Sequence, residues 1–310
     1  MKTRFLFTLT TALLAGAAAP SEAAAPAFTP GANGEFTFDT GALRGTLRRE
    51  GKSLGLTGVT DLASGKRLDR SNGLFSHYRV FTKGVRYGGG AWDWPSQAAA
   101  GPAGSVEVRW PSAAGRPFEL RASYAWRGPA ILDVETSVTA EQDLAGFESF
   151  LASYFGEGFS NAAVAVTQLP GTPPAQSPGA LQFLPALKTY GDWQMFPRGP
   201  AVVPLMTDDR WKLPPNPVDW TIMPAFAKPI ALRRDPASGL TAVLMSPPAD
   251  CFAIACPHQA EAHYSVYFSL FGRDLKAGET ARARARLLVA AAPTDQQILG
   301  AYEAYLRALK

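Results

Sequence analysis

Alternation between apolar and polar residues limits the possible folds of this sequence more than any other feature. Apolar side chains recur at every second position in five segments, at 106–110, 118–126, 132–138, 264–270 and 281–287. Because successive side chains of a strand point to opposite faces, each segment gains one face for packing and one for solvent or a ligand. Turn-forming residues separate such segments, which favours a sandwich over a parallel sheet. The sequence therefore predicts an all-β fold, a large antiparallel β-sandwich with long loops.

The N-terminus has the composition of a secretory signal peptide. Lys2 and Arg4 precede a mostly apolar run at 5–19, and the small residue Ala23 follows. The run is too short to span a bilayer comfortably, and no later stretch is long and apolar enough to do so. We therefore expect residues 1–23 to be a signal peptide, the mature chain to be periplasmic or secreted, and no transmembrane segment to remain after signal cleavage. An ordinary buried N-terminal helix is the alternative.

The remaining residues, 24–310, contain no evident linker or internal repeat, and we expect a single β-sandwich domain. Its last segment, 294–309, has the pattern of an amphipathic helix. Thr294 and Gln297 have the spacing of a capping box. One helical face is apolar, with Ile298, Leu299, Tyr302, Tyr305, Leu306 and Leu309. We expect this helix to pack on the sandwich as a structural element.

The middle of the chain, from about 168 to 236, follows a different pattern. Proline is frequent there and periodicity is poor, which is typical of long loops with short strands because proline cannot donate to a sheet. Aromatic residues are scattered through the region: Phe183, Tyr190, Trp193, Phe196, Trp211, Trp220 and Phe226. Long loops of compact domains are commonly functional. The aromatic residues could equally hold the region in place by packing.

Charge and motifs exclude several classes of function. The formal net charge is +4, without the clustered basic stripe of a nucleic-acid-binding protein, so no nucleic-acid partner is expected. The sequence has neither the H-E-x-x-H motif of zinc proteases nor the G-x-x-x-x-G-K motif of phosphate-binding loops. Nucleotide and hydride-transfer functions are therefore not expected, and neither are a cofactor or a metal site. A weak positive charge still permits an anionic ligand such as a uronic acid.

Two cysteines, Cys251 and Cys256, are present. Their spacing is not a metal motif because no second pair exists. Export makes a disulfide possible, and closing so short a loop would add little stability. Two buried thiols are an equally good prediction.

The densest cluster of polar and aromatic residues extends from His77 to Trp94. Glycines at 88–90 allow a free turn that presents the aromatic rings on either side of it. Aromatic faces cover the C–H groups of a sugar, while charged groups bond its hydroxyls or a carboxylate. The predicted substrate-binding residues are Arg79, Arg86, Tyr87, Trp92, Asp93 and Trp94. The alternative is a hinged hairpin whose tryptophans enter the core.

Three residues are candidate acid–base groups: His77, His263 and Glu148. Histidine titrates near neutral pH, and both histidines lie on segments with a strand period. The alternation places His77 and Arg79 on one face, and places His263 opposite the apolar face of its strand. Glu148 interrupts an aromatic-rich strand, where an ionised group is costly unless it is paired. A structural histidine, or an arginine partner for Glu148, is the alternative explanation.

The order of these features resembles the galactose-mutarotase-like supersandwich superfamily. The strand with His77 and Arg79, the long aromatic loops, and the closing hairpin of 264–271 and 281–289 carry the resemblance. It implies large antiparallel sheets with a concave sugar-binding face. In epimerases of that type, a histidine and a carboxylate exchange protons with the ring oxygen and the anomeric hydroxyl of the sugar.

These observations together predict an exported protein with a carbohydrate ligand. The first hypothesis is an enzyme, an epimerase, lyase or hydrolase that acts on a sugar or uronic acid in a concave cleft. The second is a non-catalytic glycan-binding β-sandwich module with the same aromatic platform and structural histidines. The third is a purely structural exported protein. Convergence of histidine, carboxylate and arginine in one pocket favours the first hypothesis.

Overall fold

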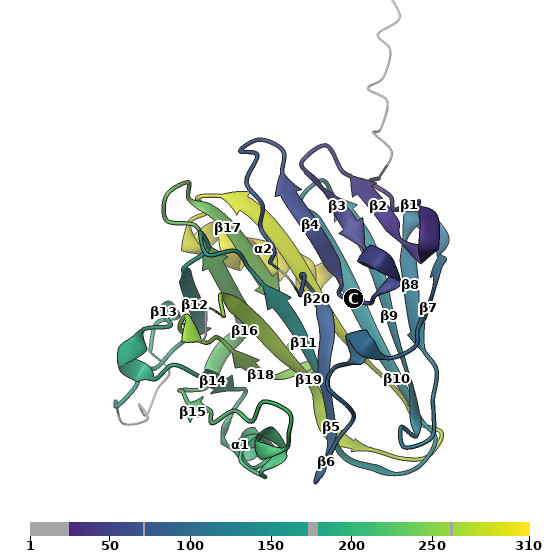
Figure 1. Cartoon of the computed structure of the whole chain (residues 1–310). Coiled ribbons are helices and arrows are strands. Elements are labelled where there is room, and N and C mark those ends of the chain that lie inside the picture. The colour runs from purple at the N-terminus through teal and green to yellow at the C-terminus, as the bar shows by residue number, and fades with distance from the viewer. Residues whose placement is uncertain (1–24, 71, 173–178, 261–262) are drawn as a thin grey trace, which may run out of the picture.

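Three β-sheets build the chain (Figure 1), which confirms the all-β prediction. The computed structural model describes residues 25–70, 72–172, 179–260 and 263–310, so the predicted signal peptide at 1–23 lies outside the described residues. Every pairing recorded between the described strands is antiparallel except the short one between β14 (Gln194–Pro197) and β15 (Thr221–Ile222).

The largest sheet has nine strands and contains four of the five alternating segments. In spatial order it consists of β13 (Gln182–Pro185), β12 (Asn161–Val166), β16 (Phe226–Arg234), β17 (Leu240–Met245), β20 (Thr280–Ala291), β10 (Ile131–Ala140), β9 (Phe118–Gly128), β8 (Val106–Trp110) and β7 (Gln97–Ala100). Along β9 each second side chain from Phe118 to Trp126 is buried, as the sequence period predicts.

A second sheet of seven strands packs face to face against the first. Its spatial order is β15, β14, β18 (Cys251–Ala255), β19 (Ser265–Leu275), β11 (Leu144–Tyr154), β5 (Ser76–Thr82) and β6 (Val85–Arg86). Strand β19 contains the alternating segment predicted at 264–270.

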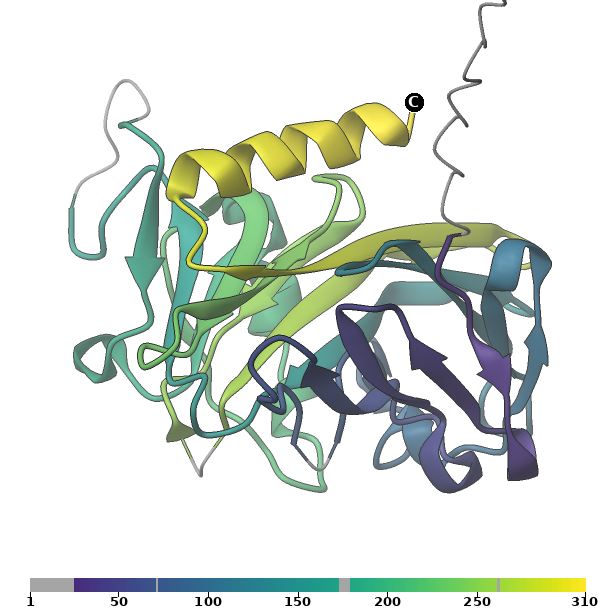
Figure 2. The same cartoon turned by 90° about the horizontal axis from the view of Figure 1, so that it is seen from above.

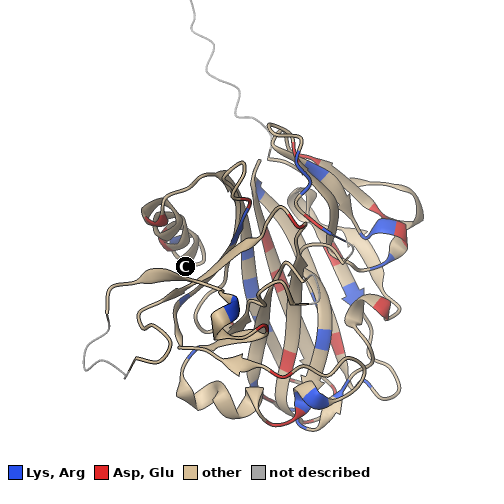
Figure 3. Cartoon of the chain, turned by 60° about the vertical axis from the view of Figure 1, so that its left-hand side comes forward, with Lys and Arg blue, Asp and Glu red and all other residues tan. Residues whose placement is uncertain are grey.

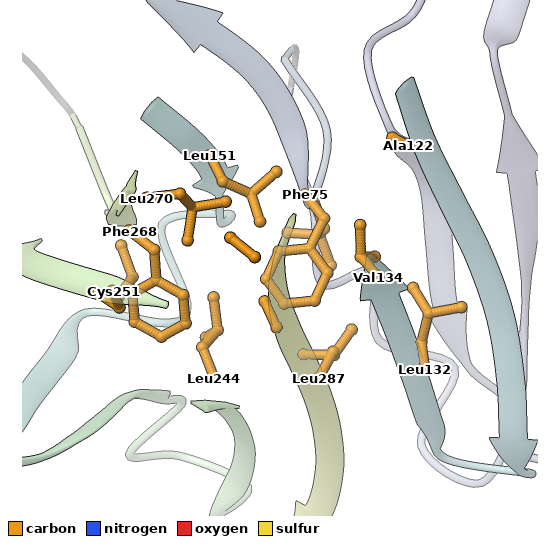
Figure 4. Close-up of a cluster of buried hydrophobic side chains, with 14 of the residues drawn as sticks. Phe75, Ala122, Leu132, Val134, Leu151, Leu244, Cys251, Phe268, Leu270 and Leu287 are labelled. Carbon is orange, nitrogen blue, oxygen red and sulfur yellow. The ribbon is translucent and has the colours of Figure 1, made fainter. Parts of the chain in front are cut away.

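The main core fills the space between the two sheets. Inward side chains of the nine-stranded sheet, such as Val134 and Leu287, meet those of the seven-stranded sheet, such as Leu151 and Phe268 (Figure 4). All four are essentially closed to solvent. Burial of apolar surface on this scale is the main driving force for the sandwich.

A smaller sheet of four strands, β1 (Thr29–Pro30), β2 (Phe36–Asp39), β3 (Leu43–Leu47) and β4 (Leu56–Asp61), lies at one end of the sandwich. Aromatic packing joins it to β9, since the rings of Phe38 and Trp126 have centroids 4.9 Å apart. Figure 2 shows this small sheet, coloured purple, at one end of the sandwich.

The C-terminal helix α2 (Asp295–Ala308) lies across the outer face of the nine-stranded sheet (Figure 2). The predicted capping box is present, because the Thr294 side chain accepts from the Gln297 backbone and the Gln297 side chain accepts from the Thr294 backbone. Buried Ile298, Tyr302 and Tyr305 pack on that sheet. Among the described helices none is long and apolar enough to cross a membrane.

Both cysteines are buried free thiols, so the structure supports the second of the two predictions for them. Charged residues of both signs alternate along the strands in the view of Figure 3. On the outer face of the nine-stranded sheet, arginines of β20 pair with acids of β10, for example Arg286 with Asp133 at 2.6 Å. Arg282 and Arg286 of β20 are therefore each paired with an acid of the neighbouring strand.

The remaining short elements lie in the connections. They are α1 (Val203–Met206) and the 3₁₀-helices η1 (Ala32–Gly34), η2 (Arg49–Gly51), η3 (Ala91–Asp93), η4 (Pro102–Gly104), η5 (Lys188–Tyr190), η6 (Pro200–Val202) and η7 (Arg210–Lys212). The segment between β14 and β15 crosses the outer face of the seven-stranded sheet, where Trp211 packs on Phe81 and Phe150. This proline-rich region is the long middle loop predicted from the sequence.

Candidate functional site

A cavity of about 600 Å³ lies between the outer face of the seven-stranded sheet and the segment that crosses it. Its floor is made by side chains of β5, β11 and β19, and its wall by the middle loop and the chain just before β19. The lining residues are Tyr78, Arg79, Phe150, Tyr154, Trp193, Trp211, Asn216, Pro217, Val218, Asp219, Trp220, His263 and Tyr267. Cavities of this size and mixed lining are typical of small-ligand sites.

A β-bulge in β5 places two neighbouring residues on the floor. Val80 pairs with Ser149 and His77 pairs with Leu151, so Tyr78 and Arg79 together stand opposite one residue of β11. A bulge of this kind reverses the alternation beyond it. Tyr78 and Arg79 consequently both face the cavity.

The same bulge sends His77 to the other side of the sheet. Its ring is closed to solvent between the two sheets, 5.1 Å from the Trp110 ring, and its Nε2 lies 2.9 Å from Thr136 Oγ1. Burial lowers the pKa of His77 to about 3. The structure therefore separates His77 from Arg79 and from the cavity, whereas the sequence period placed the two on one face.

Arg79 is held between aromatic rings. Its guanidinium lies 5.0 Å from the Tyr78 ring centroid and 5.1 Å from the Trp211 ring centroid. Nη2 donates to the backbone carbonyl of Asn216 at 2.7 Å and to the Tyr78 hydroxyl at 3.4 Å. Arg79, which the sequence predicts as a substrate-binding residue, therefore lines the cavity.

Two tyrosines supply hydroxyl groups from neighbouring strands. Tyr154 of β11 and Tyr267 of β19 have ring centroids 5.5 Å apart. Burial raises the pKa of Tyr154 well above its usual value, and the nearby Tyr267 acts in the same direction. Burial raises the pKa of Tyr267 to about 12. Both phenols are therefore protonated at neutral pH.

Tryptophans of the middle loop form the wall. The Trp220 ring stands edge-on to both Trp193 and Trp211, with centroids 5.7 Å and 5.2 Å away. Trp193 is partly exposed and lies 5.3 Å from the His263 ring. These rings give the cavity apolar faces next to its polar floor.

His263 is the only one of the three predicted acid–base residues that lines the cavity. Its Nδ1 lies 3.0 Å from the Ala260 carbonyl, and a carbonyl can only accept, so Nδ1 carries the proton of the neutral ring. The lone pair is then on Nε2. The His263 and Tyr154 rings have centroids 5.8 Å apart, which brings an imidazole and a phenol to one side of the cavity.

Glu148 lies on the same face of β11 but beneath the wall. Arg210 Nη1 donates to its carboxylate at 3.0 Å, and the Ser269 hydroxyl donates at 2.8 Å. Burial raises the pKa of Glu148, while the charge of Arg210 opposes that effect. The structure therefore gives Glu148 the arginine partner that was the alternative reading of this residue, and it does not line the cavity.

The aromatic residues of the predicted binding loop lie either next to the cavity or packed against other parts of the protein. Trp92 does not line the cavity but stacks on Tyr78, which does. Their ring centroids are 4.3 Å apart and their planes are at 5°. Tyr87 is buried and its hydroxyl is 3.0 Å from Thr82 Oγ1. Trp94 packs under the guanidinium of Arg116 at 4.1 Å.

The two charged residues of that loop also lie outside the cavity lining. Asp93 is exposed. Arg86 donates to the backbone carbonyls of Gly88, Gly89, Leu213 and Pro215, and so ties the glycine turn to the middle loop. Of the six predicted substrate-binding residues, only Arg79 lines the cavity.

Residues 51–55 match the G-x-S-x-G spacing of a hydrolase nucleophile. The structure shows a different context, because Ser53 follows a 3₁₀-helix and precedes β4 rather than joining a strand to a helix. Its buried hydroxyl lies 2.8 Å from Ser96 Oγ. Ser53 therefore has a structural role and not that of a hydrolase nucleophile.

Sequence reasoning missed most of the residues that build the cavity. Tyr154 lies on the outward face of β11, together with Glu148 and Phe150, and Tyr267 lies on the outward face of β19. The alternation of these two strands could therefore have indicated that both tyrosines face away from the core.

Within the described ranges, no group of three or more histidine, cysteine, aspartate or glutamate residues is arranged to hold a metal ion.

No protein-family model matches the chain, and no curated protein matches it significantly. Solved structures do match. A galactose mutarotase-like protein from Lactobacillus casei is 12% identical with a TM-score of 0.50, over 83% of this chain and 100% of that one. An α-N-acetylgalactosaminidase from Bifidobacterium bifidum is 10% identical with a TM-score of 0.48, over 88% of this chain and 36% of that one.

A galactose 1-epimerase from Lactobacillus acidophilus is 9% identical with a TM-score of 0.43, over 83% of this chain and 94% of that one. Identities this low concern the fold alone. The L. casei protein is matched over its whole length. The chain has the galactose-mutarotase-like β-sandwich fold.

Proposed function

We propose that this chain is an exported carbohydrate-active protein, and that it acts as an enzyme on a saccharide bound in the cavity. The observation that carries the proposal is the meeting of Trp193 and Trp220 with Arg79, Tyr154 and His263 around one cavity. Aromatic faces suit the C–H surfaces of a sugar ring, and the polar groups suit its hydroxyls. The galactose-mutarotase-like fold supports the same class of ligand.

Proton transfer is the chemistry that these groups support best. Nε2 of His263 carries a lone pair in the neutral ring and accepts a proton from the substrate. The phenol of Tyr154 is protonated at neutral pH, and its hydroxyl donates a hydrogen bond to a substrate oxygen. A base and a hydrogen-bond donor on one side of the same cavity fit epimerisation or elimination.

Two-carboxylate glycoside hydrolysis has less support. It requires a pair of acidic side chains that flank the scissile bond. Among the described residues that line the cavity, Asp219 is the one acid, and its side chain is 89% exposed and bound to Lys212. We therefore rank epimerase and lyase above hydrolase.

A non-catalytic glycan-binding module is the second candidate. It is favoured by the positions of His77 and Glu148, which leave His263 as the one predicted acid–base residue at the cavity. The aromatic wall would bind a glycan equally well without any reaction.

Turnover separates the two candidates. The chain without residues 1–23 is incubated with mono- and oligosaccharides, including uronates, and NMR follows epimerisation, unsaturated products and new reducing ends. Replacing His263→Gln lowers turnover by about two to four powers of ten, the usual contribution of a general acid or base. His258→Gln is the matched control, since His258 Nδ1 bonds the Ala186 carbonyl outside the cavity lining. Glycan binding without any turnover would support the second candidate.

Export is part of the proposal and rests on the sequence of residues 1–23. Expression of the full chain in a bacterial host, followed by fractionation and N-terminal sequencing, tests it. Removal of a segment that ends near Ala23, with the product outside the cytoplasm, is the expected result. An intact N-terminus in the cytoplasm would contradict it.

A further inference from the structure

Arg79 has unused hydrogen-bonding capacity inside the cavity. The residue is 3% exposed, and the structure records no carboxylate partner for it among the described side chains. Nη2 is used by Asn216 and Tyr78, whereas Nε and Nη1 are buried without a hydrogen-bond partner in the described part of the chain. A buried guanidinium with free donors is costly unless something compensates its charge.

Two other buried arginines of the described chain have more partners within the protein than Arg79 has. Arg210 binds the carboxylates of Glu148 and Asp208. Arg233 donates to four backbone carbonyls, those of Phe159, Ser160, Pro257 and Ser265. Neither of these arginines lines the cavity. Arg79 differs from them because it lines the cavity and has two nitrogens without a partner, whereas Arg233 has one and Arg210 has none.

The charge around Arg79 is positive. Arg86 lies close enough that the charge of Arg79 adds to burial in lowering the pKa of Arg86. The nearest lining acid, Asp219, is largely exposed at the rim and is paired with Lys212 at 2.6 Å. Nothing in the described lining therefore neutralises the guanidinium from the cavity side.

We propose that the saccharide taken by this cavity carries an anionic group, a carboxylate or a sulfate ester, which binds the free donors of Arg79. The inference rests on the proposed carbohydrate function and specifies its substrate class. An anion there compensates the buried charge and forms charge-assisted hydrogen bonds, which are the strong ones. A neutral sugar would leave the guanidinium uncompensated.

The test compares glycans that differ only in charge. The chain without residues 1–23 is titrated with a panel of uronic-acid polysaccharides and their carboxyl-reduced forms, and with sulfated glycans and their desulfated forms. We expect binding of an anionic member to exceed that of its neutral form by at least about tenfold, the value of one charged hydrogen bond. Preference among the carboxylate and sulfate pairs identifies the anion.

Two variants assign the preference to Arg79. Arg79→Gln removes it, whereas Arg282→Gln, which removes one charge from the far face of the nine-stranded sheet, retains it. Melting temperatures report whether each variant is folded. If Arg79→Gln does not fold, the wild-type comparison of charged and neutral forms decides alone.

The possible outcomes distinguish failure of the anionic-substrate proposal from failure of the proposed carbohydrate function. Equal or tighter binding of neutral glycans overturns the anionic substrate and leaves the carbohydrate function in place. Failure to bind any glycan of the panel, charged or neutral, contradicts both. A preference for the anion that survives in folded Arg79→Gln removes Arg79 from the role.

Discussion

Glu148 and Arg210 form an ion pair that solvent does not reach. Their charged atoms are 3.0 Å apart, and neither side chain is more than 1% exposed. The pair joins the centre of the seven-stranded sheet to the segment whose next residue, Trp211, belongs to the cavity wall. A carboxylate on a strand thus contacts a loop residue that is 62 residues away in the chain.

Breaking this pair is expected to destabilise the fold strongly. Glu148→Gln leaves the buried Arg210 with Asp208 as its remaining acid partner, and losing one partner of a buried pair costs about 3 kcal/mol of unfolding free energy. Denaturant unfolding measures the loss. Asp143→Asn is the control, because Asp143 and Lys276 form an exposed pair, and solvent-exposed ion pairs contribute little to stability. Equal losses in the two variants would contradict the role of Glu148.

His77 predicts how stability depends on pH. Its pKa is about 3 in the folded chain and about 6.5 in the unfolded chain, so between these values only the unfolded chain binds the proton. The unfolding free energy therefore falls as the pH decreases below about 6.5, by about 1.4 kcal/mol per pH unit from this group. Denaturant unfolding between pH 7 and about pH 5, above the range in which most carboxylates titrate, measures the slope.

A folded His77→Gln variant should be less sensitive to pH over the same range. His258→Gln serves as the comparison, since His258 is only partly buried, and it should keep the wild-type slope. An unchanged slope in His77→Gln would show that His77 is not the titrating group.

The fold could be predicted because it depends on a period that the sequence repeats. In β9, buried residues alternate without a break with less buried ones from Phe118 to Trp126, and the sequence shows the same alternation of apolar and other residues. The capping box at Thr294 is equally local. Both features depend on neighbouring residues, which a single sequence displays.

The candidate site could not be predicted to the same degree, because it depends on a bulge and on distant contacts. One extra residue in β5 reverses the alternation between His77 and Val80, so the prediction that His77 and Arg79 share one face was wrong. No residue type in that segment signals the bulge. Trp211 and Trp220 reach the cavity only through the path of a proline-rich loop, which has no period to follow.

The free thiols give a further prediction. Cys251 and Cys256 are fully buried, and burial raises the pKa of each thiol. Because the thiolate is the reactive form, we expect neither to react with a thiol reagent in the folded chain, and both to react after denaturation without a reductant. Mass spectrometry after alkylation counts the modified residues. A denatured chain that resists alkylation until it is reduced would show a disulfide instead.

Substitution of two tryptophans, Trp193 and Trp94, is expected to affect ligand binding and stability separately. Trp193 lines the cavity and is partly exposed, while Trp94 lies outside it, packed on Phe118 and beneath Arg116. Trp193→Ala should weaken glycan binding by about tenfold through the loss of apolar contact with the sugar, with a small change in melting temperature. Trp94→Ala should do the opposite, lowering the unfolding free energy by about 2 kcal/mol, less than for a fully buried tryptophan, while glycan affinity is retained.

Titration calorimetry with a glycan that binds the wild type, together with thermal unfolding of each variant, measures both quantities. The comparison controls for the loss of an indole ring, because each variant removes one from the same chain. If Trp94→Ala abolishes binding and Trp193→Ala does not, the ligand lies at the glycine-hinged loop, as the sequence alone suggested, and the cavity over the seven-stranded sheet is not the site.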